Sequence, residues 1–253
     1  MATYKKRGYK NTNTANNSNS AEADSATAEV FEKLDSTASK TEEWVSKYQN
    51  FILVGIGTIA ISVLSYLAYQ KFVSEPKELE AVSELSQAQY YFDLAVNGQN
   101  SDSLFLRALN GGEGKYGFID IIENYSGTPA AKLATYSAGM AYLNLKDYKN
   151  AIDYLDTFNS DDILLSALSK GAIGDAFAQI DQQEEAYEYY VKAFESSDNL
   201  FSTPKYLYKA AMLGASLGKN SSALSYFKRI KSDYPDSTEA KLVEVQIGRL
   251  ENQ

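Results

Sequence analysis

The feature that most constrains this chain is an uncharged run of 23 residues, from Tyr48 to Gln70, with a lysine on each side. At about 1.5 Å per residue, a helix of this length extends roughly 30 Å or more, which is enough to cross the hydrocarbon core of a bilayer. Aromatic residues of the kind found at membrane interfaces lie near both ends, at Trp44, Tyr66 and Tyr69. We therefore predict a transmembrane helix over residues 48–70, the alternative being a buried helix of a soluble core.

A cleavable signal peptide fits this run less well, because the run is long, 47 residues precede it, and no small-residue cleavage pattern follows it. We expect the helix to remain as an anchor. Seven Lys and Arg residues precede the run, whereas the 20 residues after it hold only Lys71 and Lys77. Because positive charge stays on the cytoplasmic side, we predict a cytoplasmic N-terminus and a translocated C-terminal part, residues 71–253.

The composition excludes several classes of function. The chain has no cysteine and no histidine, which rules out disulfides, thiol or imidazole metal ligands, cysteine nucleophiles and Ser-His-Asp triads. Acidic and basic residues balance before the apolar run, so the net charge of −9 belongs to the part after it. An acidic domain without a basic stripe is a poor ligand for nucleic acid. We predict no enzyme activity, no small-molecule substrate, and no catalytic, cofactor-binding or metal-binding residues.

Two segments precede the anchor. Residues 1–23 are rich in Asn and Ser and poor in aliphatic side chains, so we predict a disordered cytoplasmic tail. Residues 24–47 show helical spacing of less polar residues and predict an amphipathic juxtamembrane helix that lies on the membrane or pairs with a partner; a frayed helix is the alternative. Its apolar face consists of Phe31, Leu34, Ala38, Thr41, Val45 and Tyr48.

Beyond the anchor, the pattern predicts a helix that begins near Pro76, because proline is tolerated in the first helical turn. This helix is expected to end at Asn97-Gly98. A shorter helix over about 103–109 and a glycine-rich loop over 111–117 complete this part.

The remaining sequence repeats itself. The segment that starts at Tyr125 and continues to Leu133 recurs 109 residues later, from Tyr234 to Leu242, and three periods of about 36 residues fit between the two copies. Small residues recur at the expected places, and so do alanines about 12 residues after them. These positions are Gly139, Gly174, Ala211 and Gly248 for the first set, and Ala151, Ala186 and Ala223 for the second. Each copy is predicted to be a helix, a short polar turn and a second helix.

The segments Gly139-Met-Ala-Tyr142 and Gly174-Asp-Ala-Phe177, with the alanines that follow, resemble the tetratricopeptide repeat. That resemblance implies that a small residue lets two paired helices approach and that an aromatic side chain three residues later fills the remaining gap. The third copy departs from this pattern, since Gly214 stands where the aromatic is expected. The predicted fold is all-α: one transmembrane helix followed by a tetratricopeptide-type α-solenoid, with repeats at about 116–253.

The wider layout is similar to that of the YfgM-like ancillary subunits of the Sec translocon. The likeness consists of a polar tail, one signal anchor, a proline-capped helix, the segment from Tyr116 to Tyr125 and an acidic repeat domain. It implies a single-pass protein of the bacterial inner (cytoplasmic) membrane whose C-terminal domain lies in the periplasm. The partners that it implies are Sec translocon subunits, a periplasmic chaperone or prolyl isomerase, and exported chains.

In tetratricopeptide proteins, the first helices of successive repeats line a concave surface that binds peptides or proteins. Carried over by position, the resemblance implies a protein-binding groove lined by Tyr136, Met140, Asn144, Asp175, Gln179, Lys205, Tyr208, Lys209 and Met212. Lys205 and Lys209 fall where relatives that clamp a peptide carboxylate carry basic residues. The other clamp positions are not basic, so we do not expect a C-terminal carboxylate as the ligand.

These features predict a membrane-anchored protein–protein interaction adaptor that holds a partner near the translocon during protein export. The alternative is a structural scaffold of another envelope assembly, such as a division, cell-wall or secretion machine. Both would use the same groove, so the identity of the partner separates them.

Overall fold

The structure of the chain is a computed structural model that describes residues 26–98, 101–196 and 198–252. The predicted tail, residues 1–23, therefore lies outside the described residues. The chain divides into two units, Met1–Ser65 and Tyr66–Gln253. Throughout the described residues the regular structure is helical, apart from an isolated bridge between Gly112 and Lys115. The predicted all-α class is confirmed.

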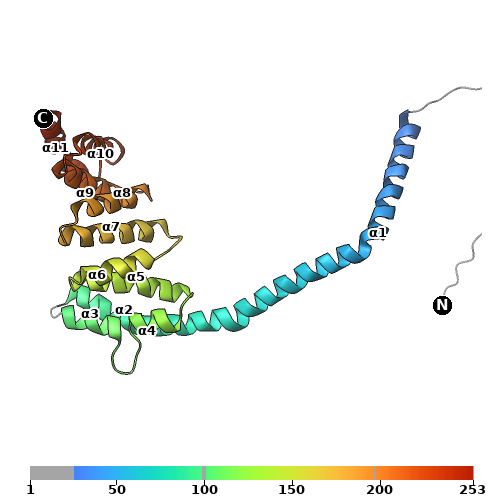
Figure 1. Cartoon of the computed structure of the whole chain (residues 1–253), viewed down its shortest axis with the longest axis horizontal. Helices are drawn as coiled ribbons and strands as arrows, with labels where there is room; N and C mark the ends of the chain where they lie inside the picture. Colours follow the sequence, from blue (N-terminus) through green and yellow to red (C-terminus); the bar gives the residue numbers. More distant parts are fainter. Residues whose placement is uncertain (1–25, 99–100, 197, 253) are drawn as a thin grey trace, which may run out of the picture. The chain divides into compact units, whose positions relative to one another are not determined.

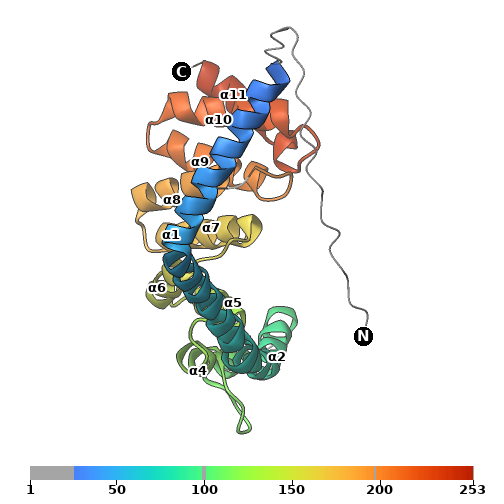
Figure 2. The same cartoon turned by 90° about the vertical axis from the view of Figure 1, so that its right-hand side faces the viewer.

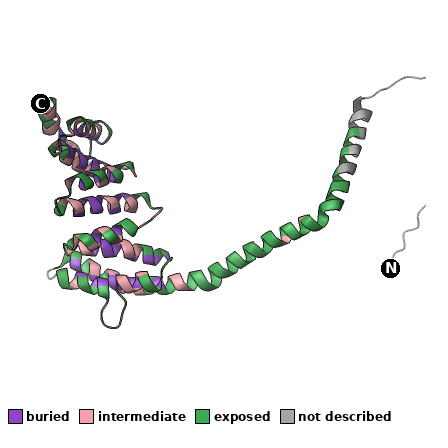
Figure 3. Cartoon of the chain, viewed as in Figure 1, coloured by how far each residue is buried: buried purple, intermediate pink, exposed green. Residues whose placement is uncertain are grey.

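The first helix, α1 (Ala26–Tyr69), contains nearly the whole uncharged run. Its large apolar residues are exposed along the run, apart from the half-buried Ile52, and Figure 3 colours nearly all of this part of the helix as exposed. By length and composition, the described chain offers one helix able to cross a membrane, within Thr41–Asn97. None of the side chains in its most apolar window is buried by the protein itself.

The chain does not leave the helical conformation at Pro76, where the sequence predicted a new helix to begin. A π-helical turn, Gln70–Ser74, leads directly into α2 (Glu75–Asn97). In this turn the Glu75 N–H donates to the Gln70 carbonyl, five residues earlier. Because Pro76 has no N–H and its ring crowds the preceding turn, a widened turn lets the helix continue past it.

Helices α2, α3 (Ser101–Asn110) and α4 (Phe118–Asn124) form the first part of the second unit. α2 buries one face, including Leu85 and Tyr91, and ends at Gly98 as predicted. The ring of Phe92 packs edge-on against Phe105 and Phe118, with centroids 5.5 and 6.0 Å away. Through these contacts α2 packs against α3 and α4 directly before the first repeat.

The repeats form three pairs of antiparallel helices that are stacked in sequence order (Figures 1 and 2). The three first helices are α5 (Pro129–Asn144), α7 (Ile163–Gln179) and α9 (Thr203–Ser216). The three second helices are α6 (Tyr148–Thr157), α8 (Gln183–Glu195) and α10 (Asn220–Asp233). The predicted repeat array is confirmed, and Ala151, Ala186 and Ala223 are each fully buried.

The small residues allow the close approach that the repeat pattern implies. A Cβ added to Gly139 would lie 2.5 Å from Leu155 Cγ, and one added to Gly174 would lie 2.7 Å from Tyr190 Cε1. In the third repeat, Gly214 stands where the aromatic is expected, and the ring of Tyr187 from the preceding repeat fills this space. A Cβ added to Gly214 would lie 3.0 Å from Tyr187 Cε2. The stack therefore stays packed despite the departure.

The last helical segment of the described chain follows α10. A 3-10 turn, Glu239–Lys241, comes first, and α11 (Val243–Glu251) follows. Val243 is buried against the last repeat, and Lys231 and Lys228 of α10 pair with Glu244 and Glu251 at 2.8 and 2.7 Å. α11 therefore covers the end of the array.

Candidate protein-binding groove

Three side chains from three helices meet between the second and third repeats. The Asp175 carboxylate of α7 accepts a hydrogen bond from Lys209 of α9 at 2.5 Å and one from the Tyr190 hydroxyl of α8 at 2.7 Å, both at Oδ1. The Lys209 ammonium also lies 5.3 Å from the centroid of the Tyr190 ring. We call these three residues the Asp175 cluster.

The cluster lies between two open pockets that share Ala178, Tyr190 and Lys209, and we call the two together the groove. The first pocket lies toward the first repeat, and the second lies toward the end of α9. The first is completed by Leu143, Asn144, Lys146, Tyr148, Asp175 and Gln179. The second is completed by Gln183, Tyr208, Met212, Leu213 and Ser216.

Charge and hydrogen-bonding capacity are concentrated at the centre of the groove. The side chains of Lys209 and Asp175 remain 32% and 35% exposed, so a ligand can reach both members of the ion pair. Burial, and then the neighbouring Asp175 carboxylate, raise the pKa of Tyr190 and also that of Tyr206. Both hydroxyls therefore stay protonated near neutral pH, which suits hydrogen bonding rather than proton transfer.

Six of the nine predicted groove residues line these pockets. Three belong only to the first pocket, two belong only to the second, and Lys209 lines both. These residues are Asn144, Asp175, Gln179, Lys209, Tyr208 and Met212.

The other three predicted residues, Tyr136, Met140 and Lys205, do not line either pocket. Tyr136 and Met140 pack against the buried group formed by Leu155, Ala172 and Ile173. The Lys205 ammonium lies 5.4 Å from the centroid of the Tyr206 ring. Position on a first helix is therefore not sufficient to place a side chain in the groove.

Tyr206 explains why the groove is confined to one end of the first helices. Its ring packs directly over α7, where a Cβ added to Gly171 would lie 2.0 Å from Tyr206 Cε1. Near the middle of α5, the Tyr136 ring packs on Phe158 with centroids 5.3 Å apart. These aromatic rings fill the space beside the middle of α5 and α7, and the two pockets lie closer to the ends of the first helices.

Sequence reasoning missed the contribution of the second helices, notably Tyr148 and Tyr190. The Tyr190 ring is buried, but its hydroxyl reaches the groove. The clue lies at Gly174, whose missing side chain makes room for the Tyr190 ring. An aromatic that crosses at a glycine on a first helix can project its polar end onto the concave side.

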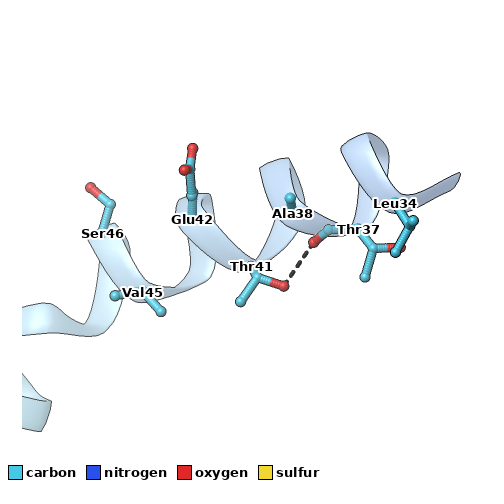
Figure 4. Close-up of a pocket in the computed structure, with 7 residues that line it drawn as sticks. All are labelled: Leu34, Thr37, Ala38, Thr41, Glu42, Val45 and Ser46. Atoms are coloured by element: carbon cyan, nitrogen blue, oxygen red, sulfur yellow. Dashed lines mark hydrogen bonds between the residues drawn. The ribbon is translucent and has the colours of Figure 1, made fainter. Parts of the chain in front are cut away.

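A second candidate surface lies on α1 (Figure 4). A shallow strip runs along one side of the helix past Leu34, Ala38, Thr41 and Val45, four members of the predicted apolar face. The Thr41 hydroxyl donates to the Thr37 carbonyl at 2.7 Å. Phe31, another predicted member, lies outside the side chains that the structure describes. One helix alone cannot enclose a ligand, so this strip is a contact surface rather than a binding cavity.

Comparisons with known proteins agree with the repeat geometry. Residues 134–158, in α5 and α6, match the tetratricopeptide repeat family, and so do residues 206–237, in α9 and α10. No curated protein matches the chain. A solved structure described as the crystal structure of MamA protein is 17% identical in sequence and superposes with a TM-score of 0.46. The match covers 66% of this chain and 85% of the MamA chain. On the two family matches and the three helix pairs, the chain carries a tetratricopeptide-type helical repeat domain.

Proposed function

We propose that the protein is a membrane-anchored adaptor that binds a protein partner in the groove. The observation that carries this proposal is the Asp175 cluster, which contains a partly exposed ion pair and lies between two open pockets of a tetratricopeptide-type array. Arrays of this type serve as protein-interaction scaffolds. The chain lacks histidine and cysteine, and we propose that it works without catalysis or a cofactor.

The groove favours an extended peptide segment as the ligand. Gln179 and Gln183 offer amide groups that suit the polar backbone of a peptide, while Tyr208 and Met212 offer apolar surface beside them. Methionine adapts its shape to different apolar side chains. The Lys209 and Asp175 charges would select for complementary charge on either side of the bound segment.

The proposed setting is the bacterial inner membrane, with α1 as the anchor, the N-terminus in the cytoplasm and residues 71–253 in the periplasm. Support comes from the uncharged run, from the excess of Lys and Arg before it, and from the similarity of layout to the translocon-associated family. On this basis the partners are Sec translocon subunits beside the anchor, and a periplasmic chaperone or an exported chain in the groove.

Site-specific crosslinking in cells tests this function. A photoreactive amino acid at Met212, in the groove, is compared with one at Lys205, which is two turns earlier on α9 and outside both pockets. The proposal expects partner crosslinks from position 212 that are lost on Lys209→Glu, and few from position 205. Equal crosslinking from both positions would contradict a groove-specific partner.

The identity of the crosslinked protein then separates the two candidate roles. Translocon subunits, chaperones or exported chains would support the export adaptor. Division, cell-wall or secretion proteins would support an envelope scaffold instead. Exchange of α1 for an unrelated transmembrane helix should reduce co-purification of the translocon while leaving crosslinks from position 212 in place.

A further inference from the structure

Two turns of the repeat array carry pairs of large apolar side chains that face solvent. Ile163 and Leu164, the first two residues of α7, are 62% and 37% exposed, and Leu200 and Phe201, just before α9, are 81% and 68% exposed. The pairs are 37 residues apart, which is the local repeat distance from Gly174 to Ala211. They therefore occupy equivalent places in successive repeats, and we call them the apolar edge.

Both turns are held by the same hydrogen-bond pattern. The Asp162 Oδ1 accepts from the backbone N–H groups of Leu164 and Leu165 at 2.8 and 3.0 Å. The Asn199 Oδ1 accepts from the N–H groups of Phe201 and Ser202 at 2.8 and 2.7 Å. Such side-chain caps order a turn locally. The apolar side chains are therefore presented outward by ordered backbone.

The opposite edge of the array has a different character. The turns within each repeat are built around Lys146, Asp181 and Gly218, which adopt positive φ angles of 63°, 60° and 76°. Lys146 and Asp181 are charged, exposed residues at the tips of these turns. Ile180, beside Asp181, is 41% exposed, but it stands alone, so exposed apolar pairs belong to the other edge of the array.

The chain enters the second unit at the apolar edge. Lys77 of α2 donates to the Ser126 carbonyl at 3.1 Å, and Glu78 accepts from the Ala130 N–H at 3.2 Å, so the start of α2 adjoins the start of α5. Figure 1 shows the connections that precede α5, α7 and α9 on this same side of the array. The uncharged run ends at Gln70, eight residues before Glu78, which corresponds to about 12 Å of helix.

We propose that the apolar edge rests on the lipid bilayer, with Leu200 and Phe201, and Ile163 and Leu164, inserted among the headgroups and upper acyl chains. This inference rests on the proposed membrane anchoring. Two separated pairs of apolar side chains suit a fluid lipid phase, which adapts to any shape, whereas a protein partner needs a closely packed continuous patch. The chain joins the array from the anchor at this edge, since only the residues between Gln70 and Glu78 separate the uncharged run from the start of α5.

The charges beside the apolar edge select the type of lipid. Asp162 is engaged in its cap, and Asp198 accepts a hydrogen bond from the Tyr234 hydroxyl and lies 3.8 Å from Arg229. Asp161 adds a third carboxylate at this edge. These acids lie at an edge that also carries the basic Lys77 and Arg229, and such mixed charge fits zwitterionic headgroups. The groove, at the ends of the first helices, would then face away from the bilayer.

The absence of cysteine allows a direct test in the full-length protein. Single-cysteine variants Leu200→Cys and Asp181→Cys, on the apolar and the opposite edge, are labelled with an environment-sensitive fluorophore and reconstituted in phosphatidylcholine nanodiscs. A third variant, Ile59→Cys, reports on the anchor. We expect blue-shifted emission at 200 that is quenched by spin-labelled lipid, and solvent-like emission at 181 that is quenched by aqueous iodide.

The outcomes separate this inference from the anchoring on which it rests. Lipid quenching at 59 with iodide quenching at 200 would overturn the docking of the edge and leave the anchor intact. Emission at 200 that is blue-shifted but unaffected by lipid quencher would show a protein covering the edge, and would also overturn the proposal. Failure of lipid quenching at 59 would refute the anchoring itself. An Ile163→Cys variant repeats the test if labelling at 200 disturbs the fold.

Discussion

The uncharged part of α1 and the repeat array use the same apolar residue types in opposite ways. Phe51 and Ile59 of α1 are 78% and 66% exposed, whereas Phe227 and Ile230 of α10 are completely buried. The composition of the helices does not produce this difference. In the array, each first helix packs against a second helix, so apolar side chains are buried between them. The described part of the chain contains no helix that packs against the uncharged part of α1.

The glycines of the two regions show the same contrast. A Cβ added to Gly55 or Gly57 of α1 meets no atom within 4 Å, but one added to Gly171 of the array meets the Tyr206 ring at 2.0 Å. In the array, a side chain of the same chain leaves no room for a larger residue at Gly171. The described residues leave room for a side chain at Gly55 and Gly57, so only lipid or another helix could require glycine there, as expected for an anchor.

The largest expected effect comes from core truncation. Phe227→Ala should lower the free energy of unfolding of the repeat domain by about 3–5 kcal/mol, because it removes a fully buried ring and leaves a cavity. Phe51→Ala is the matched change in α1 and should leave the unfolding transition of the domain unchanged. Circular dichroism melts of both full-length variants in detergent measure this. Equal destabilisation by the two changes would contradict the difference in burial between α10 and α1.

Adding volume should produce the next largest effect. Gly171→Ala places a methyl group against the Tyr206 ring and should cost about 1–3 kcal/mol through overpacking. Gly55→Ala introduces the same group into open space and serves as the control. If Tyr206 is the obstacle, the second substitution Tyr206→Leu should recover part of the loss. No recovery would mean that the glycine is needed for another reason.

Alkaline pH should destabilise the array. Burial raises the pKa of Tyr190, Tyr206 and Tyr226 above the ordinary value of 10.0, so the folded state keeps protons that the unfolded state loses. Stability from this source is complete below about pH 10 and is lost as pH rises above it. Urea unfolding midpoints measured from pH 8 to 11 should fall at the upper end, and Tyr206→Phe should reduce the slope. A flat profile would contradict the burial of these hydroxyls.

The smallest effect on stability is expected in the groove. Lys209→Met removes a partly exposed ion pair and should change the free energy of unfolding by about 1 kcal/mol or less. Partner binding should weaken more, since the charge is presented to the ligand. Lys205→Met on the same helix is the control and should leave binding unchanged. A large loss of stability with normal binding would make the Asp175 cluster structural instead.

The sequence predicted the fold better than the site, for a physical reason. Repeat spacing and small residues such as Gly139 and Gly174 determine how neighbouring helices pack, and both follow from local pattern. The open part of the concave surface depends on where large rings come to rest. Tyr206 crosses to Gly171 of another repeat and closes one half, and no spacing within a single repeat indicates that contact.

The continuous helix past Pro76 was missed for a similar reason. Proline favours a helix start, but it is also compatible with a helix interior when the preceding turn widens, and the π-helical turn at Gln70–Ser74 provides this. The local pattern at Pro76 is compatible with both arrangements, and the start of α2 also makes contacts with α5, such as Glu78 with Ala130. These contacts join residues 52 positions apart.

We propose that α1 crosses the membrane and that the repeat domain lies on its outer side. Labelling with a membrane-impermeant maleimide in cells whose outer membrane has been opened tests this most directly, using Glu42→Cys, Ser62→Cys and Gln179→Cys in the cysteine-free chain. The account predicts labelling of position 179 in such cells, labelling of position 42 only after the inner membrane is disrupted, and protection of position 62 until detergent is added. Labelling of position 42 with protection of position 179 would reverse the orientation, and immediate labelling of position 62 would contradict the membrane-spanning helix.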